Sequence, residues 1–164
     1  MRLGVRSYPR AVPEPVLRRA TAADVPAIGR VVAASFAKYV ERIGKPPAPM
    51  LHDYAAVIAR HRVWVLFDGG VLVGVLVNEV HGDHLLLDTI AVDPAAQGRG
   101  LGTVLLARAE ADARELGLGE VRLFTNEKMT ENQTFYPRHG YVETHRGQQD
   151  GYDRVFYAKR VADR

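Results

Sequence analysis

The chain has 164 residues, 47% of them hydrophobic and none of them cysteine, and its formal net charge is +3. This composition excludes a disordered chain and a disulfide or thiolate-metal scaffold, and the scattered positive charges argue against a nucleic-acid partner. No apolar window is long enough to span a bilayer, so we expect a cytoplasmic protein with no membrane partner.

We expect an N-terminal arm over residues 1–15 and a single domain over residues 16–164, because this length supports one sizeable core. Hydrophobic periodicity and turn residues divide the domain into strands and helices. In chain order, the sequence predicts a strand at 16–20, helices at 21–40 and 51–60, strands at 63–67, 71–80 and 85–92, a helix at 101–116, a strand at 120–125, a short helix around Tyr136, and strands at 141–146 and 154–159.

Turns and crossovers indicate how these elements form a sheet. Connections at residues 68–70, 81–83 and 147–151 are typical of hairpins and predict antiparallel pairs. The helix between the strands at 85–92 and 120–125 predicts a parallel pair, because a helical crossover joins parallel neighbours. We therefore expect an α/β fold with a sheet of mixed direction.

The most informative segment is a glycine-rich loop, Gln97–Gly102 (QGRGLG), which joins a predicted strand to the start of a predicted helix. Its backbone N–H groups and the positive end of the helix dipole favour an anion, and glycine allows that anion to approach closely. The lack of Lys before Thr103 excludes a Walker loop, and glycines at steps of two exclude the dinucleotide fingerprint. The loop therefore predicts capture of a phosphate or pyrophosphate.

A second motif, NQTFYPRHGY, runs from Asn132 to Tyr141. The Q-x-x-G-x-G pattern of the loop, placed after an I-A-V strand end, and the Y-x-x-x-G-Y ending of this motif resemble the GNAT superfamily of N-acetyltransferases. The two motifs cover residues 85–145, and the flanking strand pattern extends the resemblance to residues 16–160.

One position departs from the family pattern. The family often has Asn seven residues before the Tyr of the second motif, where this chain has Met129. Either Asn126 or Asn132 takes that role. We favour Asn132, because it precedes Tyr136 by one helical turn and shares its face.

The resemblance implies a mixed, mostly antiparallel sheet with a central splayed parallel pair and about four flanking helices. It also implies acetyl-CoA as co-substrate, no metal, and a pantetheine arm that pairs with β-strand backbone in the splay. The cofactor-binding residues that it implies are Ile90, Ala91, Val92, Gln97, Gly98, Arg99, Gly100, Leu101, Gly102, Thr103, Asn132 and Tyr136.

The reaction implied by the resemblance is direct transfer of the acetyl group from acetyl-CoA to a primary amine of a small molecule or peptide. Tyr136 is then the catalytic acid that protonates the departing thiolate, and a backbone N–H near Val92 polarises the thioester carbonyl. The alternative function is a non-catalytic acyl-CoA-binding or sensing module, which would keep the loop but not turnover.

The sequence leaves open which group takes the proton of the amine. The candidates for this general base are Glu79, His81, Asp83, His84 and Asp88. Simple strand alternation places Asp88 on one face with Ile90 and Val92. The His and Asp residues at 81–84 lack a further well-spaced ligand, so we expect no metal site there.

The resemblance also bears on the acceptor and on assembly. It implies an acceptor site built from the first two helices and the Pro-rich loop at 44–49, with Phe36, Tyr39 and Tyr54 as candidate lining residues. It further implies a homodimer paired through the C-terminal strands. The apolar and aromatic segment Arg154–Ala158 is suited to an exposed sheet edge of that kind.

Overall fold

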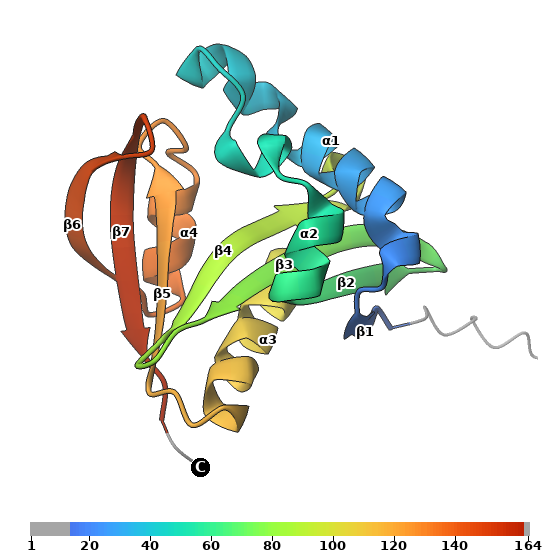
Figure 1. The fold of residues 1–164 in the computed structure, drawn as a ribbon. Coiled ribbons are helices and arrows are strands. Elements are labelled where there is room, and N and C mark those ends of the chain that lie inside the picture. Colours follow the sequence, from blue (N-terminus) through green and yellow to red (C-terminus); the bar gives the residue numbers. More distant parts are fainter. Residues whose placement is uncertain (1–13, 163–164) are drawn as a thin grey trace, which may run out of the picture.

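A computed structural model describes residues 14–162, which form a seven-stranded sheet with helices on both faces (Figure 1). The strands are β1 (Val16–Arg19), β2 (Arg62–Asp68), β3 (Val71–Val80), β4 (Leu85–Val92), β5 (Glu120–Asn126), β6 (Val142–Gln149) and β7 (Tyr152–Arg160). The helices are α1 (Val25–Ile43), α2 (Tyr54–Arg60), α3 (Leu101–Glu115) and α4 (Asn132–Arg138), with short 3-10 turns η1 (Ala22–Asp24), η2 (Ala48–Leu51) and η3 (Pro94–Ala96). The expected arm at residues 1–15 lies outside the described residues, except for its last two.

The strand order in the sheet is β1-β2-β3-β4-β5-β7-β6. Every neighbouring pair is antiparallel except β4 and β5, which are parallel and joined by the α3 crossover. The expected mixed, mostly antiparallel fold with a central parallel pair is confirmed.

The parallel strands β4 and β5 separate soon after they begin. Their backbone pairing joins Leu85–Leu87 to Val121–Leu123 and stops there. Beyond these pairs, β4 stays on β3 as far as Val92, whereas β5 stays on β7 as far as Asn126. Figure 1 shows the β5-β7-β6 part of the sheet turned away from the β1–β4 part. Within residues 14–162, the two backbone edges that face each other across this splay have no strand partner.

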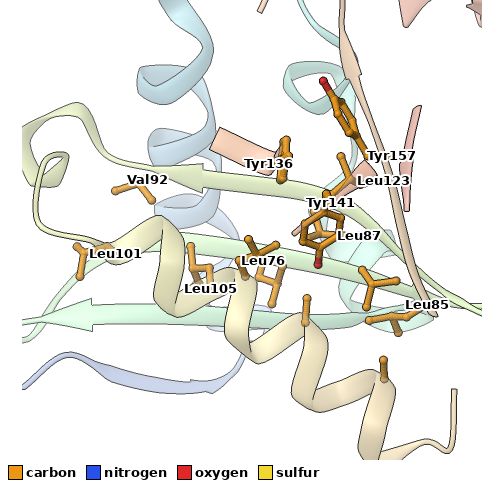
Figure 2. Close-up of a cluster of buried hydrophobic side chains, with 14 of the residues drawn as sticks. Leu76, Leu85, Leu87, Val92, Leu101, Leu105, Leu123, Tyr136, Tyr141 and Tyr157 are labelled. Atoms are coloured by element: carbon orange, nitrogen blue, oxygen red, sulfur yellow. The ribbon is translucent and has the colours of Figure 1, made fainter. Parts of the chain in front are cut away.

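Two hydrophobic clusters hold the helices on the sheet. On one face, Leu105 of α3 shares a buried cluster with Leu76 and Leu87 (Figure 2). On the other face, Ile28 of α1 shares a buried cluster with Val75. Each such side chain stabilises the fold by about 1.5–3 kcal/mol when fully buried. No helix within residues 14–162 is long and apolar enough to cross a bilayer.

Local sequence signals set the ends of the helices. A capping box at Thr21 and Asp24 precedes α1, where the Thr21 N–H donates to the Asp24 carboxylate at 2.7 Å. Asp53 caps α2 by accepting a hydrogen bond from the Ala55 N–H at 3.1 Å. Gly44, with φ of 90°, ends α1 in the left-handed conformation that glycine adopts most easily.

The last hairpin is tighter than expected. β6 continues to Gln149 and β7 begins at Tyr152, so the predicted connection at 147–151 is a two-residue turn. Asp150 and Gly151 form this turn with φ of 55° and 81°. An Asp-Gly pair favours this turn, because both central residues of a type I′ hairpin need positive φ.

The expectation that Arg154–Ala158 forms an exposed sheet edge is wrong. This segment belongs to β7, which pairs with β5 on one side and with β6 on the other. The free edge at this end of the sheet is β6, and its residues 142–149 are all exposed.

β4 contains one extra residue, which simple alternation does not anticipate. Val77 of β3 pairs with Thr89, and the next residue, Asn78, pairs with Leu87. Asp88 therefore has no partner on β3 and forms a β-bulge. Such a bulge reverses the alternation of side chains between the two faces of the sheet.

The bulge separates Asp88 from the residues with which it was expected to share a face. Ile90 and Val92 pack with the cluster under α3. Asp88 instead lies 3.9 Å from His52, next to α2, and accepts a hydrogen bond from Thr89 at 2.9 Å. The expected common face of Asp88, Ile90 and Val92 is therefore wrong.

Candidate functional site

The loop after β4 presents a row of backbone N–H groups at the start of α3. Gly98 and Gly100 have φ of 80° and 75°, and Gly100 is the N-cap of the helix. Among residues 14–162, no protein atom accepts a hydrogen bond from the N–H groups of residues 98–103. These free donors, together with the helix dipole, make the loop a receptor for an anion.

The side chains of the loop have different partners. Gln97 Nε2 donates to the Val92 carbonyl at 3.1 Å and so ties the loop to the end of β4. The Arg99 guanidinium pairs with the Asp68 carboxylate at the end of β2. Arg99 thus contributes its backbone to the loop, while its side chain points to the β2–β3 turn.

A hollow of about 340 Å³, here called the loop pocket, lies against this loop. Its lining comes from the loop, α1, α3, α4 and the end of β4. The residues are Ser35, Phe36, Lys38, Tyr39, Ile90, Val92, Gln97, Gly98, Gly100, Leu101, Gly102, Thr103, Glu131, Asn132 and Phe135. Most of the sequence-predicted binding residues therefore meet here. Ala91 does not line the pocket, because its side chain is buried in the cluster under α1.

A second hollow, here called the splay pocket, has a volume of about 120 Å³ and lies where β4 and β5 separate. Its lining residues are Phe36, Pro47, Ala48, Pro49, Leu87, Asp88, Thr89, Ile90, Phe124, Thr125, Asn126, Met129, Asn132, Phe135, Tyr136, Tyr152 and Arg154. Four residues line both hollows: Phe36, Ile90, Asn132 and Phe135. The two pockets therefore adjoin each other in the splay.

Tyr136 lines the splay pocket from α4 and is 7% exposed. Its ring packs against Phe135, Tyr141 and Tyr157, with ring centroids 5.2, 5.8 and 5.9 Å away (Figure 2 labels the three tyrosines). Burial raises the pKa of the Tyr136 phenol, and the neighbouring phenols add to the effect. The hydroxyl therefore stays protonated at neutral pH and can act as a proton donor.

The two asparagines considered for the family position have different environments. Asn132 Nδ2 donates to Thr125 Oγ1 at 2.9 Å, and its side chain lines both pockets. Asn126 lines only the splay pocket, and its Oδ1 accepts from the Lys128 N–H at 2.9 Å in the turn after β5. Of the two, Asn132 alone lines both pockets, and its role at the family position stays a prediction.

Of the five candidate bases, Asp88 alone lines the splay pocket. Burial raises the pKa of its carboxyl, and the charge of Glu79 raises it further. The Thr89 hydroxyl, His52 and His61 act in the opposite direction. A carboxylate with a raised pKa is better matched to accept a proton near neutral pH.

The other candidates lie at or near the β3–β4 turn. His84 Nδ1 and Asp83 Oδ1 are 2.7 Å apart, and the His81 and His84 rings stack at 4.7 Å. Glu79 lies 3.4 Å from His81. Within the part of the chain that the structure describes, no three His, Asp or Glu side chains gather as a metal-binding group.

Of the three aromatic candidates for the acceptor site, one lines the splay pocket and two hold other elements in place. Phe36 lines the splay pocket. The Tyr39 hydroxyl donates to Glu131 Oε2 at 2.9 Å and so links α1 to α4. The Tyr54 hydroxyl donates to the Pro49 carbonyl at 2.6 Å and so positions the Pro-rich loop.

Sequence reasoning missed two features of the splay pocket. Arg154 of β7 is buried in its wall. The Pro-rich loop is fastened over it, because the Tyr152 hydroxyl donates to the Pro46 carbonyl at 2.6 Å and Lys45 Nζ donates to the Gly151 carbonyl at 2.7 Å. The two hydrogen bonds join segments 106 residues apart, and the place of Arg154 depends on the pairing of β7 with β5, so no local pattern signals either feature.

Comparison with known proteins gives a consistent result. A family model described as an acetyltransferase (GNAT) domain matches residues 59–143. The amino-acid acetyltransferase of Mycobacterium tuberculosis is 34% identical over 134 residues, which is 79% of this chain and 69% of that protein. The mycothiol acetyltransferase of Nocardia farcinica is 41% identical over 56 residues, 34% of this chain, and the match spans only 18% of that protein.

Solved structures match along almost the whole chain. The PaiA N-acetyltransferase of Thermoplasma acidophilum, solved in complex with coenzyme A, superposes with a TM-score of 0.76. The match covers 90% of this chain and 99% of that chain, at 17% identity. At this identity the likeness shows a shared fold.

Proposed function

The chain belongs to the GNAT acetyltransferase family, and on that premise we propose that it transfers the acetyl group of acetyl-CoA directly to a primary amine of a small molecule or peptide. In this reaction a C–N bond forms and the thioester C–S bond breaks. The amine loses a proton, and the departing thiolate gains one.

The observation that carries the proposal is the junction of the two pockets in the splay between β4 and β5. The loop pocket contains the free N–H groups, and the splay pocket contains Tyr136 and Asp88. Ile90, Asn132 and Phe135 belong to both. A bound molecule that reaches from one pocket into the other would carry a phosphate at one end and a reacting group at the other.

The loop and the edge of β4 fit CoA. The N–H groups of residues 98–103 have no protein acceptor among the described residues, so they are available to a pyrophosphate. In the described part of the chain, the edge of β4 after Leu87 has no strand partner on the β5 side, so it is available to the amides of a pantetheine arm. Lys38 adds a positive charge to the lining of the loop pocket.

Tyr136 is assigned the role of catalytic acid. Tyr136 lines the splay pocket, and burial raises the pKa of its phenol and so keeps the hydroxyl protonated. It donates its proton to the thiolate as the C–S bond breaks. Its aromatic packing against Phe135 and Tyr141 fixes the ring.

Asp88 is assigned the role of general base. Asp88 lines the splay pocket and also a separate, third hollow on the α2 side. His52, His61 and Glu79 line that third hollow. His61 lies 3.6 Å from Glu79, and His52 lies 3.9 Å from Asp88. A proton taken from the amine by Asp88 can therefore pass to groups that reach solvent.

Thiol release from acetyl-CoA, measured with a panel of primary amines, tests the proposed function. We expect amine-dependent release and an acetylated amine detectable by mass spectrometry. Acetyl-CoA should also raise the melting temperature more than NAD or ATP at equal concentration, because it binds the folded state. Binding without thiol release would favour the non-catalytic acyl-CoA-binding alternative.

The cytoplasmic location and the homodimer stay predictions. A dimer through the end of the sheet would use β6, because β6 rather than β7 is the free edge there. Val142 of β6 is 67% exposed and offers an apolar contact at that edge. Light scattering of the chain and of a Val142→Lys variant measures the assembly.

A further inference from the structure

The splay pocket contains a buried positive charge that neither the proposed acid nor the proposed base uses. Arg154 lies on β7 opposite Asn126 of β5, and its side chain is 6% exposed. Its guanidinium lies 4.1 Å from the centre of the Phe124 ring and 5.5 Å from that of Tyr152. The two aromatic rings fix the position of the guanidinium in the pocket wall.

The Arg154 guanidinium has few partners within the protein. Nη1 donates to the neutral Gln149 Oε1 at 2.9 Å. The nearest carboxylate, that of Asp150, lies 3.7 Å from Nη1 and is 78% exposed. Within residues 14–162, no protein atom accepts a hydrogen bond from Nε or Nη2 of Arg154.

This situation is unusual for a buried arginine. By contrast, Arg108 on α3 donates to Asp112 at 2.7 Å and pairs with Glu115 at 2.8 Å. The one ion pair of Arg154, with the exposed Asp150, offsets only part of the desolvation cost of this buried charge. Burial lowers the pKa of Arg154, and the charges of Asp150 and Asp88 act in the opposite direction. The guanidinium nevertheless remains charged, so it offers two unused donor nitrogens, Nε and Nη2, to an anion in the pocket.

We propose that Arg154 binds a carboxylate of the acceptor, so that the enzyme acts on small amines that also carry a carboxylate, as α-amino acids do. The proposal rests on the proposed acetyl transfer and names its substrate class. Asp88, on the β4 side of the pocket, faces the amine, and Arg154, on the β7 side, faces the carboxylate. The pocket thus has one charge of each sign for a zwitterionic acceptor.

The remaining lining narrows the class further. Among the described residues that line this pocket, Arg154 is the only cation and Asp88 the only anion. A single guanidinium balances a monoanionic carboxylate, with which it forms two parallel hydrogen bonds, but not a phosphate dianion. Phe36, Pro47 and Met129 make the rest of the pocket wall apolar. A hollow of about 120 Å³ therefore suits an acceptor with a small apolar side chain.

Three matched acceptors separate the carboxylate from the rest of the molecule: L-leucine, L-leucinamide and 3-methylbutylamine. They share the amine and the apolar side chain, and only leucine has a carboxylate. Leucinamide also represents a peptide N-terminus. We expect kcat/KM for leucine to exceed that for either acceptor without a carboxylate by about 10- to 100-fold, the range for hydrogen bonds to charged groups.

The Arg154→Met variant should remove this preference. We expect its KM for leucine to rise about 10- to 100-fold, while kcat and the kinetics with 3-methylbutylamine change little. Arg154→Lys keeps the positive charge but loses the planar pair of donors. Its KM for leucine should lie between those of the wild type and of Arg154→Met. Arg160→Met is the matched control, because Arg160 is an exposed residue at the other end of the same strand.

Binding provides a readout that needs no turnover. Calorimetric titration of leucine into the enzyme–CoA complex should give heat with the wild type and with Arg160→Met, but not with Arg154→Met. Equal kcat/KM for all three acceptors, unchanged by Arg154→Met, would overturn the carboxylate assignment and leave the proposed function standing. An absence of thiol release with every acceptor, together with leucine binding that depends on Arg154, would overturn the acetyl transfer instead.

Discussion

At the scale of single residues, Tyr136 and Tyr141 show how position separates chemistry from packing. Both belong to one aromatic cluster, with ring centroids 5.8 Å apart. Tyr136 lines the splay pocket, whereas the Tyr141 hydroxyl is buried without a hydrogen-bond partner among the described residues. The two tyrosines therefore form a matched pair for mutation.

Changing Tyr136→Phe should lower kcat by about 10²–10⁴-fold, the range for one acid–base group. The dissociation constant of acetyl-CoA should change little, because the ring and its contacts remain. Tyr141→Phe should leave kcat unchanged and raise the free energy of unfolding by about 1 kcal/mol, because it removes an unsatisfied buried hydroxyl. Steady-state kinetics and urea denaturation check both variants. A kcat in Tyr136→Phe close to that of the wild type would assign this tyrosine to packing.

Asp88→Asn should lower the activity and raise the melting temperature. Burial raises the pKa of the Asp88 carboxyl in the folded state, so its neutral form favours folding. That stability is present below the unfolded-state pKa and is lost as the pH rises through the folded-state pKa. We therefore expect the asparagine variant to melt higher than the wild type at about pH 8, with a smaller difference at about pH 4.

The same substitution should remove the acid limb of the pH–rate profile. In the wild type, kcat/KM falls as the pH drops through the pKa of Asp88, because the protonated carboxyl cannot accept the proton of the amine. Melting curves and initial rates at several pH values check both effects. An unchanged profile in a folded Asp88→Asn variant would remove Asp88 from the role of base.

The residues of the candidate site were predictable from sequence to different degrees. Tyr136 and Asn132 were predicted because their motif is continuous along the chain. The face of Asp88 was not, because a bulge depends on how β3 pairs with β4. Arg154 was not, because its place in the pocket wall depends on the pairing of β7 with β5.

At the scale of elements, the loop after β4 and the first turn of α3 together form the proposed CoA-binding unit. One carboxylate introduced there should abolish its binding of CoA. Gly102 has ordinary helical backbone, and a Cβ there would meet only Phe135, at 3.5 Å. Gly102→Asp should therefore fold, while its charge repels the CoA phosphates. We expect CoA affinity to fall at least about 100-fold, because like-charge contacts cost several kcal/mol.

Two glycines serve as comparisons in the same calorimetric titration. Gly82→Asp adds the same charge in the β3–β4 turn, with no atom near its Cβ, and should bind CoA normally. Gly100→Asp should lose both affinity and stability, because φ at that position is +75°. Normal CoA affinity in a folded Gly102→Asp variant would contradict the assignment of the loop.

α3 is fastened to the sheet by a buried carboxylate. Asp112 accepts hydrogen bonds from Trp64 Nε1 at 2.8 Å, Asn78 Nδ2 at 3.0 Å and Arg108 Nη2 at 2.7 Å. Asp112→Ala should lower the free energy of unfolding by about 3–5 kcal/mol, because it removes the acceptor of the buried Asn78 amide and of the Trp64 indole, and one of the two carboxylates paired with Arg108. Glu115→Ala, which removes a carboxylate that is 58% exposed from the same arginine, should change it little. Urea denaturation of the two variants compares them, and equal losses would contradict this role of Asp112.

The elements themselves were largely predictable, because their signals are local. Gly69 and Gly70 form the predicted turn between β2 and β3, with φ of 57° and 82°. The turn at Asp150 and Gly151 carries the same kind of signal, but the sequence interpretation placed it within a longer loop. Exposed polar residues along β6 obscure the end of that strand.

At the scale of the whole molecule, the order of the strands in the sheet was harder to predict from the sequence than the strands themselves. Turn lengths predicted the antiparallel pairs, and the α3 crossover predicted the parallel pair. That β7 rather than β6 pairs with β5 depends on contacts among residues far apart in the sequence. The splay follows from this arrangement, since β5 stays with β7 while β4 stays with β3.

The most direct test of acetyl transfer through the splay follows an isotopically labelled acetyl group. The protein is incubated with labelled acetyl-CoA and a primary amine, and the initial rate of label transfer is measured by mass spectrometry. We expect labelled amide with the wild type, a rate reduced about 10²–10⁴-fold with Tyr136→Phe, and normal binding of acetyl-CoA by that variant. A wild type that binds acetyl-CoA but labels no amine, or equal rates for the two proteins, would contradict the proposed mechanism.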